Sequence, residues 1–307
     1  MDTSYIVDLL AASVRIAAPL ALGALGGLLS ERSGVFAVGI EGMMLAGAFG
    51  AALGALLGGH AAFGLLFAML AGAMVAAVVA VAVTTFRSEQ MVTGLACNIL
   101  AFGLTSFLLR GLFGGSAPVI RLQTFGTVKI PLLSDIPVVG PILFQQSALT
   151  YAAVGIAAVI HVMLFRTRIG LTLRATGENP EAVYAAGGNP ILYRQCAIVL
   201  GGAVAGLGGA VLVLQDVGTF TDGMTNGRGF LALAALIVGR WSPFGVLAAC
   251  LAFGAGSALE VRLQGFNLHV SSYVIQMAPY VLALSVLVIM GRGTRMPQAI
   301  GRPYSRG

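Results

Sequence analysis

Hydrophobic residues fill this chain in long runs that charged residues rarely interrupt. Runs that contain no Asp, Glu, Lys or Arg include residues 42–86, 136–165, 195–215, 241–259 and 263–291. A helix of about 20 apolar residues crosses the hydrocarbon core of a bilayer, and each run approaches or exceeds that length. Because the bilayer offers the backbone no hydrogen-bond partner, such runs are expected to be helical. The pattern predicts an all-α, polytopic transmembrane helical bundle forming a single transmembrane domain over residues 1–307.

The spacing of these runs predicts nine spans, within a range of about 8–10. They cover residues 6–29, 35–58, 62–83, 91–113, 149–165, 193–214, 230–239, 244–259 and 273–290. An odd number of crossings places the two termini on opposite sides of the membrane.

Basic residues predict the orientation, because they gather in cytosolic loops. One set of loops carries Arg32, Arg87, Arg166, Arg168, Arg174, Arg194, Arg240, Arg292, Arg295, Arg302 and Arg306. The other set carries only Arg110, Arg121, Lys129, Arg228 and Arg262. The first set is therefore expected in the cytosol, together with the C-terminal tail at residues 291–307, and the N-terminus outside.

Composition supports this interpretation. Hydrophobic residues make up 58% of the chain and charged residues only 9%, far below the usual quarter of a soluble domain. The 43 glycines suit close helix packing in a membrane, as at Gly50, Gly54 and Gly58. The net charge of +6 includes a single lysine and no arginine-rich patch, so nucleic acid is not an expected partner. The N-terminus lacks the basic region and cleavage site of a removable signal.

Two short apolar segments differ from the other spans. Residues 230–239 rise only about 15 Å as a helix, which is half the hydrocarbon thickness, before an Arg-Trp-Ser-Pro break. Residues 34–42 resemble them, since GVFAV at 34–38 echoes GFLAL at 229–233. Paired interrupted segments in the two halves of a chain are typical of a transport pathway.

Two loops stand out. Residues 114–147 form the longest loop outside and contain four prolines, as expected of an ordered cap. The cytosolic loop at residues 166–192 encodes a short helix, with Asn179 as N-cap, Pro180 in the first helical position and Gly187 and Gly188 as the stop. This helix is either a docking element for a partner or a well-made linker.

The chain offers no catalytic constellation, so no enzyme activity and no metal site are expected. Its one lysine, Lys129, is in no phosphate-binding loop, and its three histidines match no zinc motif.

Energy for transport must then come from an ion gradient or from a partner. Ion coupling needs ionisable groups deep in the membrane. Glu41 is the best candidate, and pairing with an arginine at the cytosolic edge is the preferred interpretation. An ion-coupled secondary transporter of a small polar solute therefore remains the alternative.

Four blocks of sequence resemble the permease subunits of ABC importers of the simple-sugar and nucleoside group, and most closely the nucleoside permeases. They are 30–35 (SERSGV) with 39–44 (GIEGMM), 86–94 (FRSEQMVTG) continuing to Asn98 and 103–105 (GLT), 174–180 (RATGENP) with Ala185, Gly187 and Asn189, and 227–234 (GRGFLALA) through 239–243 (GRWSP). They span most of the chain. At Ala37 the family often has Asn instead.

The resemblance implies a bacterial cytoplasmic (inner) membrane protein whose pore imports a nucleoside or simple sugar. The implied partners are a second, probably different, permease subunit, a cytosolic ABC ATPase and an extracytoplasmic solute-binding protein. ATP and Mg²⁺ would be bound by the ATPase, so no cofactor is expected on this chain.

The resemblance and the residue chemistry together assign two sets of site residues. The set expected to couple to the ATPase is Arg174, Gly177, Glu178, Asn179, Pro180, Glu181, Ala185 and Gly187. The set expected along the substrate pathway is Phe36, Glu41, Met43, Met44, Gln90, Thr93, Asn98, Thr105 and Phe230. A neutral, amphipathic solute suits a mostly apolar pathway with a few amides, hydroxyls and rings. For Asn98 an interhelical hydrogen bond, and for the methionines and phenylalanines ordinary packing, are the simpler interpretations.

Overall fold

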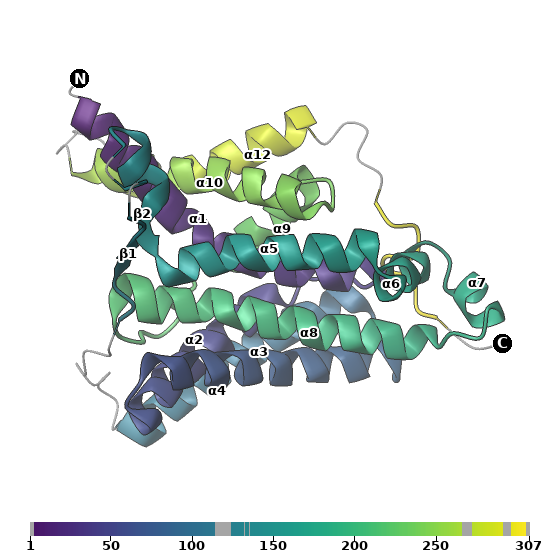
Figure 1. The fold of residues 1–307 in the computed structure, drawn as a ribbon. Helices are drawn as coiled ribbons and strands as arrows, with labels where there is room; N and C mark the ends of the chain where they lie inside the picture. Colours follow the sequence, from purple (N-terminus) through teal and green to yellow (C-terminus); the bar gives the residue numbers. More distant parts are fainter. Residues whose placement is uncertain are drawn as a thin grey trace.

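Long helices lie side by side along most of the molecule (Figure 1). The computed structural model describes residues 3–113, 124–131, 133–134, 136–265, 272–290 and 296–304. Seven of its helices are long and apolar enough to cross a membrane. They are α1 (Thr3–Arg32), α2 (Ile40–Gly58), α3 (Ala61–Thr84), α4 (Gln90–Phe113), α5 (Ala148–Arg166), α8 (Pro190–Val211), which continues as the π-helix η2 (Leu212–Val217), and α10 (Pro243–Gln264). The chain is thus a multi-pass helical membrane protein.

Shorter elements complete the described fold. Two cytosolic candidates, α6 (Arg168–Glu178) and α7 (Pro180–Ala185), follow α5, and the half-length helix α9 (Arg228–Val238) follows η2. The last span is divided into α11 (Ser272–Gln276) and α12 (Ala278–Met290), with Pro279 in the first turn of α12, where a missing N–H is tolerated. Residues 127–129 (β1) and 145–147 (β2) pair as a small antiparallel ribbon beside the π-helix η1 (Gly140–Phe144).

The two chain ends lie at opposite ends of the bundle, as the odd number of passes predicts (Figure 1). The N-terminus lies beside β1 and β2, and we call this the ribbon end. Helices α6 and α7 lie with the C-terminal residues at the other end, which we call the coupling end. Residues 114–123 of the predicted outer loop and 291–295 of the predicted tail lie outside the described residues.

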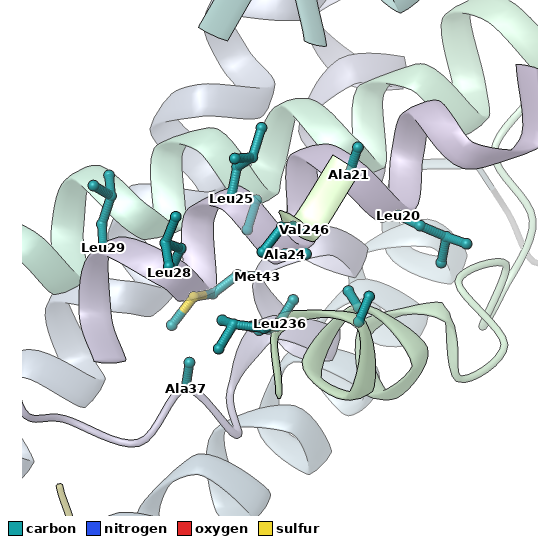
Figure 2. Close-up of a cluster of buried hydrophobic side chains, with 14 of the residues drawn as sticks. Leu20, Ala21, Ala24, Leu25, Leu28, Leu29, Ala37, Met43, Leu236 and Val246 are labelled. Carbon is teal, nitrogen blue, oxygen red and sulfur yellow. The ribbon is translucent and has the colours of Figure 1, made fainter. Parts of the chain in front are cut away.

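The core is built where α1 passes through the middle of the bundle. One face of α1 carries Leu20, Leu25 and Leu28, which are almost fully buried. Figure 2 shows this apolar face packed against Leu236 of α9 and Val246 of α10. Burial on all sides explains why α1 reads as a nearly continuous apolar run instead of an amphipathic one.

Glycines set the distance between α2, α3 and α8. A Cβ atom at Gly206 would overlap the carbonyl oxygen of Ala68 on α3, and one at Gly209 would overlap that of Met44 on α2. At Gly50 and Gly54 a Cβ would come within 2.6 Å of carbonyl oxygens of α3. The sequence interpretation of these glycines as packing residues is confirmed.

The loop predicted to be cytosolic contains more helix than expected. Residues 180–185 form the expected short helix, but residues 168–178 form a second helix, α6, that the sequence interpretation missed. Gly170, Leu173, Thr176 and Gly177 are buried on one face of α6, whereas Arg168, Ile169, Leu171 and Glu178 are exposed. Two glycines, two threonines and two arginines made this stretch resemble a loop, and its narrow apolar stripe is stabilised only by packing on neighbouring helices.

Candidate translocation and coupling site

The first feature of the site is an interruption between α1 and α2. After Arg32 the helix stops, and residues 33–39 run without regular structure until α2 begins at Ile40. Gly34 takes φ +90°, a left-handed conformation that favours glycine. The hydroxyl of Ser30 donates to the carbonyl of Val35 (3.1 Å), and that of Ser33 donates to the carbonyl of Ser30 (2.6 Å). Side chains thus replace backbone partners that the interruption removes.

The second feature is the start of the half-helix α9, which lies against the start of α2. The Glu41 carboxylate accepts hydrogen bonds from the backbone N–H groups of Gly227 (2.9 Å) and Gly229 (2.6 Å). The first N–H groups of a helix lack partners within it, and a negative charge is favourable there. Glu41 therefore caps α9 from another helix, and the prediction that it pairs with an arginine at the cytosolic edge was wrong.

Glycines make this contact possible. Gly227 has φ +80°, and a Cβ at Gly229 would lie 2.5–2.7 Å from atoms of Glu41. The interrupted segments predicted from the two halves of the chain are thus in direct contact. An interrupted span in contact with a half-length helix is the backbone arrangement expected beside a transport pathway.

Two amides of α4 hold the interrupted segment in place. Asn98 donates from Nδ2 to the carbonyl of Val38 (2.9 Å) and accepts at Oδ1 from the N–H of Gly42 (2.8 Å). Gln90 accepts at Oε1 from the N–H groups of Phe36 (2.7 Å) and Gly301 (3.2 Å). Both amides therefore satisfy backbone groups of residues 36–42, as the interhelical interpretation of Asn98 expected.

The end of α1 joins both interruptions at the coupling end. Glu31, 1% exposed, accepts from the indole N–H of Trp241 (2.5 Å) and from the N–H of Ala37 (3.3 Å). Arg32 donates from Nε to the carbonyl of Trp241 (2.9 Å). Residue 37 follows the end of α1 and residue 241 follows the end of α9, so the buried Glu31 side chain joins the segments that follow these two helices.

Helix α6 rests directly on this junction, and α7 follows it. A Cβ at Gly177 would overlap the carbonyl of Arg32, and the Arg174 guanidinium lies 4.9 Å from the centre of the Phe165 ring. These two predicted coupling residues face the bundle. The exposed residues of the predicted set are Glu178, Asn179, Glu181, Ala185 and Gly187, with Pro180 half-buried.

The predicted caps of α7 are present. Asn179 accepts at Oδ1 from the N–H of Ala182 (3.1 Å), Pro180 occupies the first turn, and Gly187 has φ +85°. Residues 296–304 pack beside the end of α6, where the N–H of Ala299 donates to the carbonyl of Gly177 (2.9 Å). The described part of the C-terminal segment thus braces α6 just before α7.

The remaining predicted pathway residues are distributed differently. Met43 and Met44 are buried in the core, and Phe36 is half-buried beside Gln90. The hydroxyls of Thr93 and Thr105 donate to carbonyls of their own helix, at Glu89 and Ala101 respectively. Phe230 is 45% exposed and lines a pocket of about 210 Å³ between α9 and α12.

Three features were missed from the sequence. They are the Glu31–Trp241 contact, the bracing by residues 296–304, and a polar cavity of about 550 Å³ between α1, α9, α10 and α12. Charged and amide residues near helix ends, such as Arg228 and Glu260, were the available signal for the cavity, but they resembled ordinary membrane-edge residues. Among the described residues, no three His, Cys, Asp or Glu side chains gather to hold a metal ion.

The Asn98 bridge predicts a stability effect. Asn98→Leu removes both hydrogen bonds and leaves the Val38 carbonyl and the Gly42 N–H unsatisfied, at a cost of about 1–3 kcal/mol each. Thermal unfolding in detergent is expected to show a clearly lowered Tm. Thr105→Val, seven residues along α4, removes only bonds within its own helix and should leave Tm nearly unchanged. Equal Tm values for the two variants would contradict a bridging role.

Comparisons with known proteins fit this architecture. Residues 9–291 match the family model described as a permease component of the branched-chain amino acid transport system. The chain belongs to this family of permease components. The chain is 38% identical to the guanosine ABC transporter permease protein NupQ of Bacillus subtilis, over 100% of this chain and 99% of that protein.

Further relatives show the same assignment over nearly the full length. The nucleoside ABC transporter permease protein NupC of Lactococcus lactis is 35% identical, over 93% of each chain. The putative glucose ABC transporter permease protein TsgC13 of Haloferax volcanii is 32% identical, over 99% of each chain. No solved structure matches the chain. This permease is therefore a pore-type subunit of the ABC-importer class, and the alternative of an ion-coupled carrier is not supported.

Proposed function

We propose that this permease forms half of the translocation pathway of an ABC importer for nucleosides, driven by a separate ATPase that docks on α7. The observation that carries the proposal is the continuous connection from an exposed capped helix to both interrupted spans. Gly177 packs on Arg32, Arg32 binds Trp241, and Glu31 binds Ala37. A displacement of α6 and α7 is thus transmitted directly to α9 and to the segment before α2.

The solute class rests on the relatives. The two bacterial relatives named above are a guanosine permease and a nucleoside permease, and both align over at least 93% of this chain. Within the same family the archaeal relative is named for glucose, so a simple sugar is the second candidate. Nucleosides and simple sugars are both neutral solutes, so the expected neutral pathway suits either class.

The remaining partners follow from the same proposal. The ATPase binds ATP and Mg²⁺, a second permease subunit completes the pore, and an extracytoplasmic binding protein delivers the solute. A second permease protein of the guanosine transporter of B. subtilis, NupP, is also a relative, at 24% identity, which favours two different permease subunits. The coupling end, with α7 and the C-terminal residues, then lies in the cytosol of a bacterium, and the ribbon end faces the binding protein.

Alternating access is the proposed mechanism. Closure of the ATPase pair moves α7, and α6 carries that motion to the ends of α1 and α9. The Glu41 contact between α2 and α9 keeps these two helices moving as one unit. The pathway then opens to the outside and receives solute from the binding protein.

The coupling role predicts an uncoupled variant. Glu178→Ala combined with Asn179→Ala removes an exposed charge and the α7 cap, which is worth about 1 kcal/mol. With the partner subunits present in proteoliposomes, ATP hydrolysis is expected to continue while nucleoside uptake falls at least about tenfold.

Asn179→Ser is the matched control, because serine caps helices as well as asparagine does. It should keep wild-type uptake, and all variants should insert in equal amounts. Unchanged uptake in the double variant would leave α7 as a linker and would refute the docking role.

A further inference from the structure

A polar cavity opens between helices α1, α9, α10 and α12, outside the set of residues predicted from sequence. It has a volume of about 550 Å³, within the range of about 300–1,000 Å³ that is common for small-molecule sites. Its polar lining comes from Asn226, Arg228, Ser257, Glu260, Gln276 and Tyr280. Helices α9, α10 and α12 lie together on one side of the bundle (Figure 1). We call this space the α9–α12 cavity.

The position of the α9–α12 cavity matches that of an entry chamber. It is lined by the first turn of α9 and by the last two turns of α10, which end near the ribbon end. Helix α9 is 11 residues long and therefore rises about 16 Å from the coupling end. The cavity thus extends from the first turn of α9, which Glu41 caps in the middle of the bundle, toward the ribbon end.

The charges in the cavity balance each other. Arg228 and Glu260 both line it and interact electrostatically. Charged side chains within a membrane protein are costly and mark functional sites. One cation and one anion give no preference for a charged solute, so the lining suits a neutral molecule that carries both donors and acceptors.

The shape of the lining adds a preference for a ring. Tyr280 is 46% exposed, and its hydroxyl donates to the carbonyl of Asn226 (3.1 Å), which fixes the phenol at the cavity wall. One oxygen of Glu260 accepts from Gln264 (3.2 Å). The aromatic face, the carboxylate and the amides together fit a heterocycle with attached hydroxyls better than a sugar alone.

The cavity continues toward the coupling end. The pocket of about 210 Å³ that Phe230 lines shares Leu231 and Tyr280 with the α9–α12 cavity. Ala234 and Leu284 extend that pocket along α9 and α12. A continuous surface therefore runs along α9, from polar residues near the ribbon end to apolar residues below them. By contrast, both polar atoms of the Asn98 amide and the Oε1 atom of Gln90 accept or donate backbone hydrogen bonds, and of these two amides only the buried Nε2 atom of Gln90 has no partner within the described residues.

We infer that the α9–α12 cavity is the chamber that receives the nucleoside, with Glu260, Arg228 and Tyr280 determining which solutes are accepted. The inference rests on the proposed function, because it assumes that this chain forms a solute pathway. It places that pathway along α9 and α12, whereas the set predicted from the sequence lay mainly on α2 and α4, with Phe230 alone on α9.

Cysteine accessibility tests the chamber without relying on transport rates. In a variant with the exposed Cys196 replaced by Ser, Ser257→Cys places a thiol in the cavity, and Leu259→Cys, two residues along α10, is exposed away from it. The probe is a membrane-impermeant, thiol-reactive methanethiosulfonate applied to the complete importer in membranes. Labelling of Ser257→Cys is expected, and saturating guanosine should slow it about tenfold while glucose should not. Leu259→Cys should show no protection.

A selectivity measurement gives the second test. Glu260→Gln keeps the size of the side chain but removes its charge, and a hydrogen bond to a charged group is worth roughly tenfold in affinity. The KM for guanosine uptake is expected to rise about tenfold, with wild-type amounts of inserted protein. Asp222→Asn is the control, because Asp222 bonds to Ser106 outside the cavity and its variant should keep the wild-type KM.

The outcomes separate the two levels of the proposal. If the wild-type importer takes up guanosine, but Ser257→Cys is unlabelled or unprotected and Glu260→Gln keeps its KM, the chamber is refuted and the proposed function stands. If the wild-type importer takes up no nucleoside and glucose protects Ser257→Cys instead, the chamber stands and the nucleoside assignment fails. Absence of both uptake and protection would refute both.

Discussion

Gly209→Leu is expected to abolish the folded protein, whereas Gly155→Leu is expected to leave it intact. A Cβ at Gly209 would overlap the carbonyl of Met44 and lie 2.6 Å from the N atom of Ala48. Both blocking atoms belong to the backbone of α2, so no side-chain rotation relieves the overlap. Overpacking costs about 1–3 kcal/mol where side chains can adjust, and a larger penalty is expected here.

The control tests the same change on an open surface. Gly155 on α5 has no atom within 4 Å of a Cβ position, so an added side chain there meets no other part of the chain. Size-exclusion chromatography of fluorescently tagged variants in mild detergent measures the monodisperse fraction. A fall of at least about tenfold is expected for Gly209→Leu only. A normal elution profile for that variant would show that α2 and α8 are not packed backbone to backbone.

Glu41→Ala is expected to insert and fold but to lose nearly all transport. The change removes two hydrogen bonds to a charged acceptor, each worth about 1.5–3 kcal/mol, and leaves the first N–H groups of α9 unpaired. It also disconnects α9 from α2, so these two helices no longer move together. Solute uptake in the complete importer is expected to fall at least about tenfold, with normal membrane levels.

Glu89→Ala provides the matched control for this variant. Glu89 also accepts from helix N–H groups, those of Met91 (3.1 Å) and Val92 (2.6 Å), and these bonds lower the pKa of its carboxyl group. Its side chain is exposed at the start of α4, where water replaces a lost acceptor. Uptake should therefore stay near the wild-type rate. Wild-type uptake by Glu41→Ala would show that the contact between the half-helices is not needed for transport.

Much of the fold was predictable because membrane burial imposes a simple rule. Long apolar runs with few or no charges must be helices, and this rule predicted a span at each of the seven long helices. The short helix α7 was also predictable, because Asn179, Pro180 and Gly187 act on their nearest neighbours. The interruption at residues 34–42 and the half-helix α9 were visible as short apolar segments that resemble each other.

The candidate site was less predictable, and Glu41 illustrates why. The sequence showed an acid within an apolar span and indicated an arginine partner, because charges usually pair with charges. Its true partners are two N–H groups about 190 residues away, which carry no side-chain signature. The same holds for Asn98, whose partners are backbone atoms of residues 38 and 42.

The sequence by itself determined the class of this protein, its span pattern, the caps of α7 and, through resemblance, its family. Those properties depend on composition and on residues close together in the chain. Only the tertiary structure decided which helix ends meet, that α6 packs on the junction of α1 and α9, and that a polar cavity opens beside Arg228 and Glu260. Such features depend on backbone groups brought together from distant segments, and every residue type carries the same backbone groups.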